Sequence, residues 1–295
     1  MSNYTCEYAR ALVERGIEGG YQFLDAMIGV DACSMMNRAM EHFEILQMND
    51  KPNFFVSHCD IPYKVTDYTL DSYVRQMRRR VLEPLAEKYG VDTSDAAIRK
   101  AVAEHNEVCA IISEIGEMRK ADNPVITGYE FHVLNLVSFT CPKQLILPYL
   151  RETLEELKTR KPDAKPAFRA RVAIVGSEID DPNLTKLIES CGALVVSDRY
   201  CFGSTPGREI IHLRDDEDAL PQICLHIMKH SECARYIADE KVQQRRDTAD
   251  RLARAFHADG IIYEQMKYCD YWGFERALVS HIMHEEYNWP VLSID

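Results

Sequence analysis

Long hydrophobic runs are absent from this chain of 295 residues. A membrane-spanning helix needs about 20 consecutive apolar residues, and no stretch of the sequence approaches that length. The N-terminus, "MSNYTCEYARALVERG", also lacks the charged and then apolar pattern of a secretory signal peptide. These absences predict a cytoplasmic protein that is not inserted in a membrane.

An excess of positive charge is absent as well. The chain has 35 Lys and Arg residues against 47 Asp and Glu residues, which gives a formal net charge of −12 at pH 7. Dedicated nucleic-acid binders carry the opposite balance, because they need clustered cations to neutralise phosphates. The charged fraction of 28% and the hydrophobic fraction of 46% are ordinary for a folded domain. We therefore expect a globular protein that does not bind nucleic acid.

Two common nucleotide-binding motifs are missing. The sequence contains no G-x-x-x-x-G-K-[ST] phosphate loop and no G-x-G-x-x-G after an expected strand, so nucleotide hydrolysis by this chain is not supported. One glycine-rich segment, "CFGSTPGRE" at 201–209, does follow an expected strand. Its backbone N–H groups and Arg208 suit a phosphate or an acyl carrier, and a tight loop before a helix is the equal alternative.

Strand and helix patterns alternate along the C-terminal half. Short Val- and Ile-rich runs at 171–177, 193–198, 260–264 and 290–294 are typical of strands buried on both faces, and helical patterns lie between them. Such alternation predicts a parallel sheet with helices on both faces. The N-terminal part repeats the pattern with expected strands at 23–30 and 53–59. We expect an α/β protein with two Rossmann-like or flavodoxin-like parallel-sheet domains and a helical insertion between them.

The insertion is expected from a change in sequence texture. Helix-forming residues dominate from Thr69 to about Arg160, and "KTRKPDAKPAFRAR" at 158–171 combines two prolines with many cations, as a linker does. The predicted division is a partial first α/β domain at 1–68, a helical segment with linker at 69–165, and a second α/β domain at 166–295.

The ten cysteines are the most informative feature that is present. A reducing cytosol argues against disulfides, and no compact C-x-x-C pair points to a metal. Ligands of open parallel sheets collect at the carboxyl ends of strands, where four cysteines are expected: Cys33, Cys59, Cys201 and Cys269. Five others lie in or beside expected helices, which favours core packing: Cys109, Cys141, Cys191, Cys224 and Cys233.

Cys6 stands apart, just before an expected helix whose N–H groups, or a metal, would stabilise a thiolate. Spacing alone leaves three uses of these cysteines open, namely iron–sulfur or zinc binding, redox chemistry, and packing.

Four segments carry a resemblance to a known family. They are "YQFLDAMIGVDAC" (21–33), "AAIRKAVAEHNEVCAIISEIGEMRKADNPVITGYE" (96–130), "LTKLIESCGALVVSDRYCFGS" (184–204) and "ADGIIYEQMKYCD" (258–270). In this order and approximate spacing the chain resembles the subunits of 2-hydroxyacyl-CoA dehydratases and of the related ATP-dependent benzoyl-CoA reductases. The resemblance implies two α/β domains with a helical insertion and a [4Fe–4S] cluster lodged between the domains.

The resemblance also implies cluster ligands. The thiolates of the family carry over best onto Cys6, Cys33 and Cys269. Cys201 matches a further cysteine-glycine position, which leaves it open as a fourth ligand, as part of a larger cluster, or as a residue lining the site. Cys59 has no counterpart in the family. The catalytic acid or base stays unknown, although Glu264, Asp270, Asp198 and Arg208 all follow or end expected strands.

The function implied by the resemblance is that of an iron–sulfur subunit of an anaerobic radical dehydratase or reductase. Its substrate would be an acyl-CoA or aryl-CoA thioester, and it would receive one low-potential electron at a time from a separate ATP-dependent iron–sulfur activator. Alternatives are a double-cluster reductase of a small molecule and a non-catalytic partner or scaffold subunit. The implied partners are a related or identical subunit and the activator.

The ends of the chain differ from the family pattern. Family members usually carry a longer segment before the first cysteine and a further helix after the last strand, whereas this chain stops at "WPVLSID". We expect part of the substrate or partner surface to come from another chain.

Overall fold

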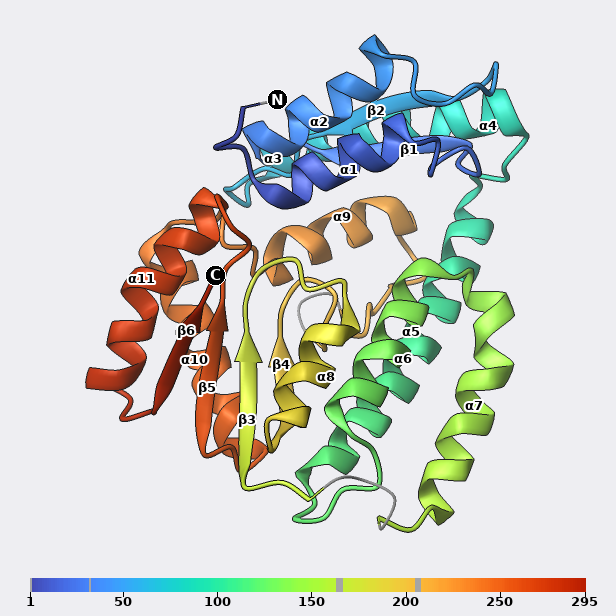
Figure 1. Ribbon diagram of the computed structural model, residues 1–295. Coiled ribbons are helices and arrows are strands. Elements are labelled where there is room, and N and C mark those ends of the chain that lie inside the picture. Colours follow the sequence, from blue (N-terminus) through green and yellow to red (C-terminus); the bar gives the residue numbers. More distant parts are fainter. Residues whose placement is uncertain (1, 32, 163–166, 205–207) are drawn as a thin grey trace. The chain divides into compact units, whose positions relative to one another are not determined.

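Two compact units make up the chain (Figure 1). The computed structural model describes residues 2–31, 33–162, 167–204 and 208–295. Unit 1 consists of Met1–Ala101 and Ile211–Ser231, and unit 2 consists of Val102–Ile210 and Glu232–Asp295. Each unit contains a sheet of parallel strands, so the expected α/β class with two parallel-sheet domains is confirmed.

Unit 1 is built on a two-stranded parallel sheet. Strand β1 (Ala26–Val30) pairs with β2 (Phe55–Cys59) in one register throughout, from Ala26 opposite Phe55 to Val30 opposite Cys59. The helix α2 (Ser34–Ile45) connects the strands and buries Phe43. The other helices of unit 1 are α1 (Glu7–Ile17), α3 (Asp67–Met77), η1 (Arg78–Leu82), α4 (Glu83–Tyr89), the first residues of α5 (Asp95–Glu117), and α9 (Ala219–His230).

Helix α9 belongs to unit 1 although it lies far along the chain. It packs on α3, and its Leu220, Cys224 and Met228 share a buried cluster with Tyr73 and Val81. Residues 211–231 therefore join the N-terminal sheet rather than the strands that flank them in sequence. The predicted division at 68/69 and 165/166 stays a prediction, because a compact unit need not be an independently folding domain.

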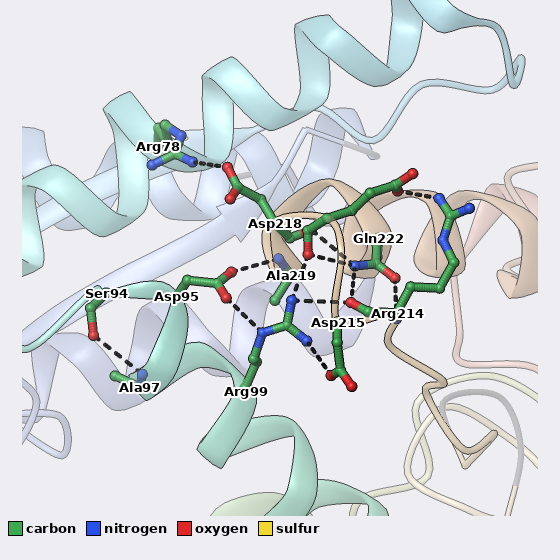
Figure 2. Close-up of polar contacts among 11 residues, drawn as sticks. Arg78, Ser94, Asp95, Ala97, Arg99, Arg214, Asp215, Asp218, Ala219 and Gln222 are labelled. Carbon is green, nitrogen blue, oxygen red and sulfur yellow. Dashed lines mark hydrogen bonds and ion pairs between the residues drawn. The ribbon is translucent and has the colours of Figure 1, made fainter.

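Polar contacts hold the start of α9 against the start of α5 (Figure 2). The Asp95 carboxylate accepts from the backbone N–H of Ala219 at 2.6 Å, and so takes up one of the free donors of the helix. The guanidinium of Arg99 donates to Asp95 at 2.6 Å and to the backbone carbonyls of Glu217 at 2.5 Å and Arg214 at 3.1 Å. One side chain thus ties α5 to the segment that leads into α9.

Replacing Arg99 by methionine is expected to lower the free energy of unfolding of the chain by about 1–2 kcal/mol, since two carbonyls and a carboxylate lose a charged donor. Chemical denaturation measures this change. The matched control is Arg78→Met in the same contact region, because Arg78 is exposed and lies 3.7 Å from the exposed Asp218 carboxylate. It should cost less than about 0.5 kcal/mol. Equal losses for both variants would contradict this role of Arg99.

Unit 2 contains a four-stranded parallel sheet with the strand order β4-β3-β5-β6. The strands are β3 (Ala170–Val175), β4 (Ala193–Arg199), β5 (Gly260–Glu264) and β6 (Val291–Ile294), all at the places expected from the Val- and Ile-rich runs. The first strand of the unit is central and the second lies beside it on one side, as in flavodoxin-like sheets. The order of connection reverses between β3 and β5, which makes their carboxyl ends the expected ligand edge.

Both faces of this sheet are covered by helices. Ala173 and Val175 of β3 face a buried cluster with α10 (Asp239–Ala255) and α11 (Asp270–Glu285). Ile174 lies in a second cluster, with α8 (Pro182–Ser190) on that face. Burial on both faces explains why apolar residues stand at consecutive positions in the middle of these strands.

A further apolar cluster of unit 2 is formed mainly by helices. It joins α5 with α6 (Gly128–Thr140) and α7 (Lys143–Thr159), and the short turn η2 (Met118–Lys120) follows α5. Across the described ranges, no helix has both the length and the apolar character needed to cross a membrane.

Candidate functional site

Three of the four expected cluster cysteines occupy the same local position, the N-cap of a helix. Cys6 precedes α1, Cys33 precedes α2 and Cys269 precedes α11, and none of these three side chains bonds to its own helix as a cap. The N-terminus of a helix carries partial positive charge and free N–H groups, which stabilise a thiolate nearby. The sequence indicated this position for Cys6 alone.

Cys6 and Cys33 lie at the starts of two neighbouring helices in unit 1. Helix α1 packs on α2, and the backbone N–H of Cys6 donates to the Met35 sulfur at 3.0 Å. Met35 is two residues beyond Cys33, in the first turn of α2. At the same edge the N–H of Asp31 donates to the Cys59 carbonyl at 2.9 Å, which extends the sheet pairing by one residue. The strand-edge position expected for Cys33 therefore holds.

Cys59 ends β2 as expected, but its side chain packs in the core of unit 1. Its sulfur lies 3.5 Å from the Met77 sulfur, and Tyr73 and Cys224 belong to the same buried cluster. Burial raises the pKa of the Cys59 thiol, and it raises the pKa of Cys224 to about 12. Both thiols thus behave as small hydrophobic groups.

In unit 2 the residues that follow β3 bond to the buried carboxyl group of Glu264, the last residue of β5. The Ser177 hydroxyl and backbone N–H both donate to Glu264 Oε2, at 2.9 and 3.1 Å. Glu264 is 8% exposed, and burial raises the pKa of its carboxyl group although the Ser177 bonds oppose this. A Cβ at Gly176 would lie 2.8 Å from the Glu264 carbonyl oxygen, so only glycine allows this approach.

The same serine fixes the turn that leads to Cys269. The Ser177 hydroxyl accepts from the backbone N–H of Met266 at 2.7 Å, and Gln265 donates through its side chain to the Cys269 carbonyl at 3.3 Å. Tyr268 has a φ of +62°, in the left-handed region that non-glycine residues seldom adopt. A turn held at this angle directs the chain into α11 with Cys269 at its N-cap.

Replacing Glu264 by glutamine is expected to change stability in a pH-dependent way. A carboxyl with a raised folded-state pKa contributes stability below its unfolded value of 4.5, and this contribution is lost as the pH rises through the folded value. Glutamine keeps an acceptor oxygen for Ser177 but carries no charge. The melting temperature of the variant should therefore rise relative to that of the native chain as the pH increases from 4.5. A difference that is constant or falls with pH would contradict the buried, proton-binding state of Glu264.

Cys201 has a different environment from the three N-cap cysteines. It follows β4, and its backbone N–H donates to the Ser177 carbonyl at 3.2 Å. Burial raises the pKa of the Cys201 thiol well above its usual value, and the nearby Glu178 and Cys233 act in the same direction. Burial also raises the pKa of Glu178, while a bond from Cys201 opposes it. Burial thus favours the neutral forms of Cys201 and Glu178, and Cys201 does not lie at a helix start.

Several charged groups of the expected edge have structural partners. Asp198 forms an ion pair of 2.7 Å with Arg119, and both side chains are at most 2% exposed. Asp270 is the exposed first residue of α11. Sequence reasoning missed Ser177 and Glu178, although "RVAIVGSE" places both directly after a buried strand.

The helical cysteines divide into buried and exposed ones. Cys109 and Cys224 are buried in helices, as expected for packing residues. For Cys191 the packing expectation is wrong, because it is exposed at the C-terminal end of α8. All ten cysteines lie in the described ranges, and none of them forms a disulfide there.

No group of three or more His, Cys, Asp or Glu side chains within the described residues is placed to hold a metal ion. Cys6 and Cys33 belong to unit 1, and Cys201 and Cys269 belong to unit 2. The donor chemistry nevertheless fits an iron–sulfur cluster, which protein thiolates hold.

Comparison with known proteins places this arrangement in a family. The family model described as 2-hydroxyglutaryl-CoA dehydratase, D-component, matches residues 1–295. The chain belongs to this family. Among curated relatives of the D-component family, the (R)-phenyllactyl-CoA dehydratase beta subunit of Clostridium sporogenes is 20% identical over 292 residues, which cover 99% of this chain and 72% of that protein. YjiM of Escherichia coli (strain K12), provisionally named as a dehydratase subunit, is 20% identical over 286 residues, 93% of this chain and 70% of its own length.

Proposed function

We propose that this chain is the iron–sulfur subunit of an anaerobic radical dehydratase that removes water from a 2-hydroxyacyl-CoA thioester. The observation that carries the proposal is that Cys6, Cys33 and Cys269 share the N-cap position in a member of the D-component family. A related subunit is the proposed partner, because one relative is named a beta subunit. An ATP-dependent iron–sulfur activator is the proposed electron donor.

The proposed cluster ligands are the thiolates of Cys6, Cys33 and Cys269. A [4Fe–4S] cluster bound there would supply low-potential electron transfer and, at an iron without a protein ligand, Lewis-acid polarisation of a thioester carbonyl. The chain itself contributes three helix starts that favour thiolates and the Ser177 bonds that fix the Cys269 turn. Cys201 is the candidate fourth ligand, and its binding would close the open iron.

Proton transfer is the second task of a dehydratase. Removal of water across a carbon–carbon bond needs one group to take a proton and another to assist departure of the hydroxyl. Glu178 and Glu264 interact with each other, and burial raises the pKa of both carboxyl groups. A carboxyl with a perturbed pKa at the ligand edge of a sheet is suited to this work, so we propose these two as the proton-handling groups of the chain.

The alternatives draw less support. A double-cluster reductase needs further thiolates, and Cys59 is enclosed with Met77 in the core of unit 1. Reduction of an aromatic ring is not favoured, because both named relatives are dehydratase subunits.

Reconstitution tests the proposed function. The chain is prepared anaerobically with a related subunit and an activator of the family, then supplied with ATP, a reductant and a panel of 2-hydroxyacyl-CoA thioesters. We expect enoyl-CoA products, detected by mass spectrometry, only when both ATP and activator are present. Reduction of benzoyl-CoA with no dehydration of any 2-hydroxyacyl thioester would reject the dehydratase assignment in favour of a reductase.

A further inference from the structure

A cavity of about 300 Å³ opens within unit 2, and no residue of the turn that leads to Cys269 is among its described lining residues. Its walls come from α5, η2, α6, the segment after β4 and α10. The polar residues that line it are Ser113, Glu117, Arg119, Ser204, Arg208, Glu209 and Arg251. Its size is at the lower end of the range for small-molecule sites.

Arg208 is the unusual group in this lining. It is 8% exposed, it stacks on the Phe139 ring at 4.1 Å, and it donates to the Asn135 side-chain oxygen at 2.9 Å and to the Ser138 hydroxyl. Within the described ranges no carboxylate forms an ion pair with it, and its Nε has no hydrogen-bond partner. The Asn135 amide nitrogen beside it is also unpartnered there. A buried cation with a free donor is expected to need an anion.

Arg119 in the same lining shows how the fold satisfies an arginine when no ligand is needed. It is 2% exposed, and it forms a 2.7 Å ion pair with Asp198. Nη2 of Arg119 donates to the Ser204 hydroxyl at 3.2 Å, and its Cζ lies 3.7 Å from the Phe131 ring centroid. Arg208 has the stacked ring but lacks the carboxylate.

Arg208 has charged neighbours of both signs, namely the cation of Lys143 and the Asp198 carboxylate, which is already paired with Arg119. Lys143 lies near enough that burial and the Arg208 charge lower its pKa. Cys109, which bonds to Arg208, stays a neutral thiol because burial raises its pKa. On the cavity wall Glu117 pairs with Lys120, and the remaining charges are Arg208, Arg251 and Glu209. These three leave one positive charge in excess.

We propose that this cavity binds a phosphate group, with Arg208 as the buried ligand and Arg251 as the exposed one at its rim. A tetrahedral oxyanion offers one oxygen to the guanidinium of Arg208 and another to that of Arg251, and both contacts are charge-assisted hydrogen bonds. The phosphate is that of a free phosphate ion or that of a coenzyme A moiety. The inference stands on the charge balance of the cavity and does not need the proposed function.

The test is phosphate binding to the chain without reconstitution, by calorimetry and by melting temperature. We expect phosphate to raise the melting temperature more than chloride at equal ionic strength. Arg251→Ser should weaken phosphate binding by about fivefold or more, and Arg208→Met should abolish it. The control is Arg254→Ser, on the same helix as Arg251. This variant should bind phosphate as the native chain does.

Coenzyme A and dephospho-coenzyme A then distinguish the sources. If the native chain binds coenzyme A about tenfold more tightly than dephospho-coenzyme A, and Arg251→Ser loses this preference, the site binds the 3′-phosphate of coenzyme A. If the two coenzymes bind equally and inorganic phosphate still binds, the site is one for free phosphate. The proposal is overturned if phosphate stabilises the native chain no more than chloride does, a result that does not depend on any variant. It is also overturned if both arginine variants bind phosphate as the native chain does. These variants are Arg251→Ser and folded Arg208→Met, which Arg208→Lys replaces if the methionine variant does not fold.

Discussion

Replacing Cys269 by serine is expected to remove most of the iron from the anaerobically prepared chain, whereas Cys191→Ser is expected to leave iron content unchanged. Cys269 caps α11 at the carboxyl end of β5 and is held there by the Ser177 and Gln265 bonds. Serine keeps the shape of the cap but is a far poorer ligand for iron than a thiolate. Iron and acid-labile sulfide per chain measure the effect.

Cys191 is the matched control because it is also a cysteine beside a helix of unit 2, but it is exposed at the C-terminal end. Circular dichroism confirms that both variants fold. Iron retained by folded Cys269→Ser, or lost equally from Cys191→Ser, would contradict the ligand assignment. The Cys201→Ser variant then shows the number of thiolate ligands. Iron retained in that variant indicates three thiolate ligands and one iron without a protein ligand, whereas loss of iron indicates four thiolate ligands.

Replacing Arg245 by methionine is expected to lower the free energy of unfolding by about 3–5 kcal/mol, because it leaves a carboxylate buried without its cation. Arg245 on α10 donates from Nε to Glu275 of α11 at 2.9 Å, and both side chains are 1% exposed. Nη2 of Arg245 also donates to Glu275, and Nη1 donates to the Tyr236 carbonyl at 2.7 Å. The pair joins the helix that Cys269 caps to its neighbour, so the loss should also loosen α11.

Arg254→Met is the control for this prediction. Arg254 lies on the same helix and pairs with Asp250 at 2.8 Å, but its side chain is 58% exposed. An exposed pair of this kind contributes about 0.3–0.5 kcal/mol. Urea unfolding of both variants gives the comparison, and a loss for Arg245→Met no greater than that for Arg254→Met would show that the buried pair is not what holds α10 to α11.

Local pattern was sufficient to predict the strands and the class of fold. Strands such as β3 and β5 are rich in consecutive apolar residues because α8 covers one face of their sheet and α10 and α11 cover the other. Cys33 and Cys269 also lie where the strand-edge rule predicts, beyond the carboxyl ends of β1 and β5 in parallel sheets.

Contacts between distant segments could not be predicted from the sequence. Helix α9 joins unit 1 by packing on α3 and through the bonds of Asp95 and Arg99, which lie more than 100 residues earlier in the chain, and no local signal marks these contacts. The burial of Cys59 depends on Met77 and Cys224, so its position at a strand end was not enough to judge its role. Ser177 acts through Glu264 and Met266, which the fold alone brings near it.

The most direct test of the central claim is the iron and acid-labile sulfide content of the native chain after strictly anaerobic preparation, with EPR after dithionite reduction. The account predicts about four iron and four sulfide per chain and the EPR signal of a reduced [4Fe–4S] cluster. A folded chain that contains neither iron nor sulfide under these conditions would contradict the account, and the cysteines at the three helix starts would then need another explanation.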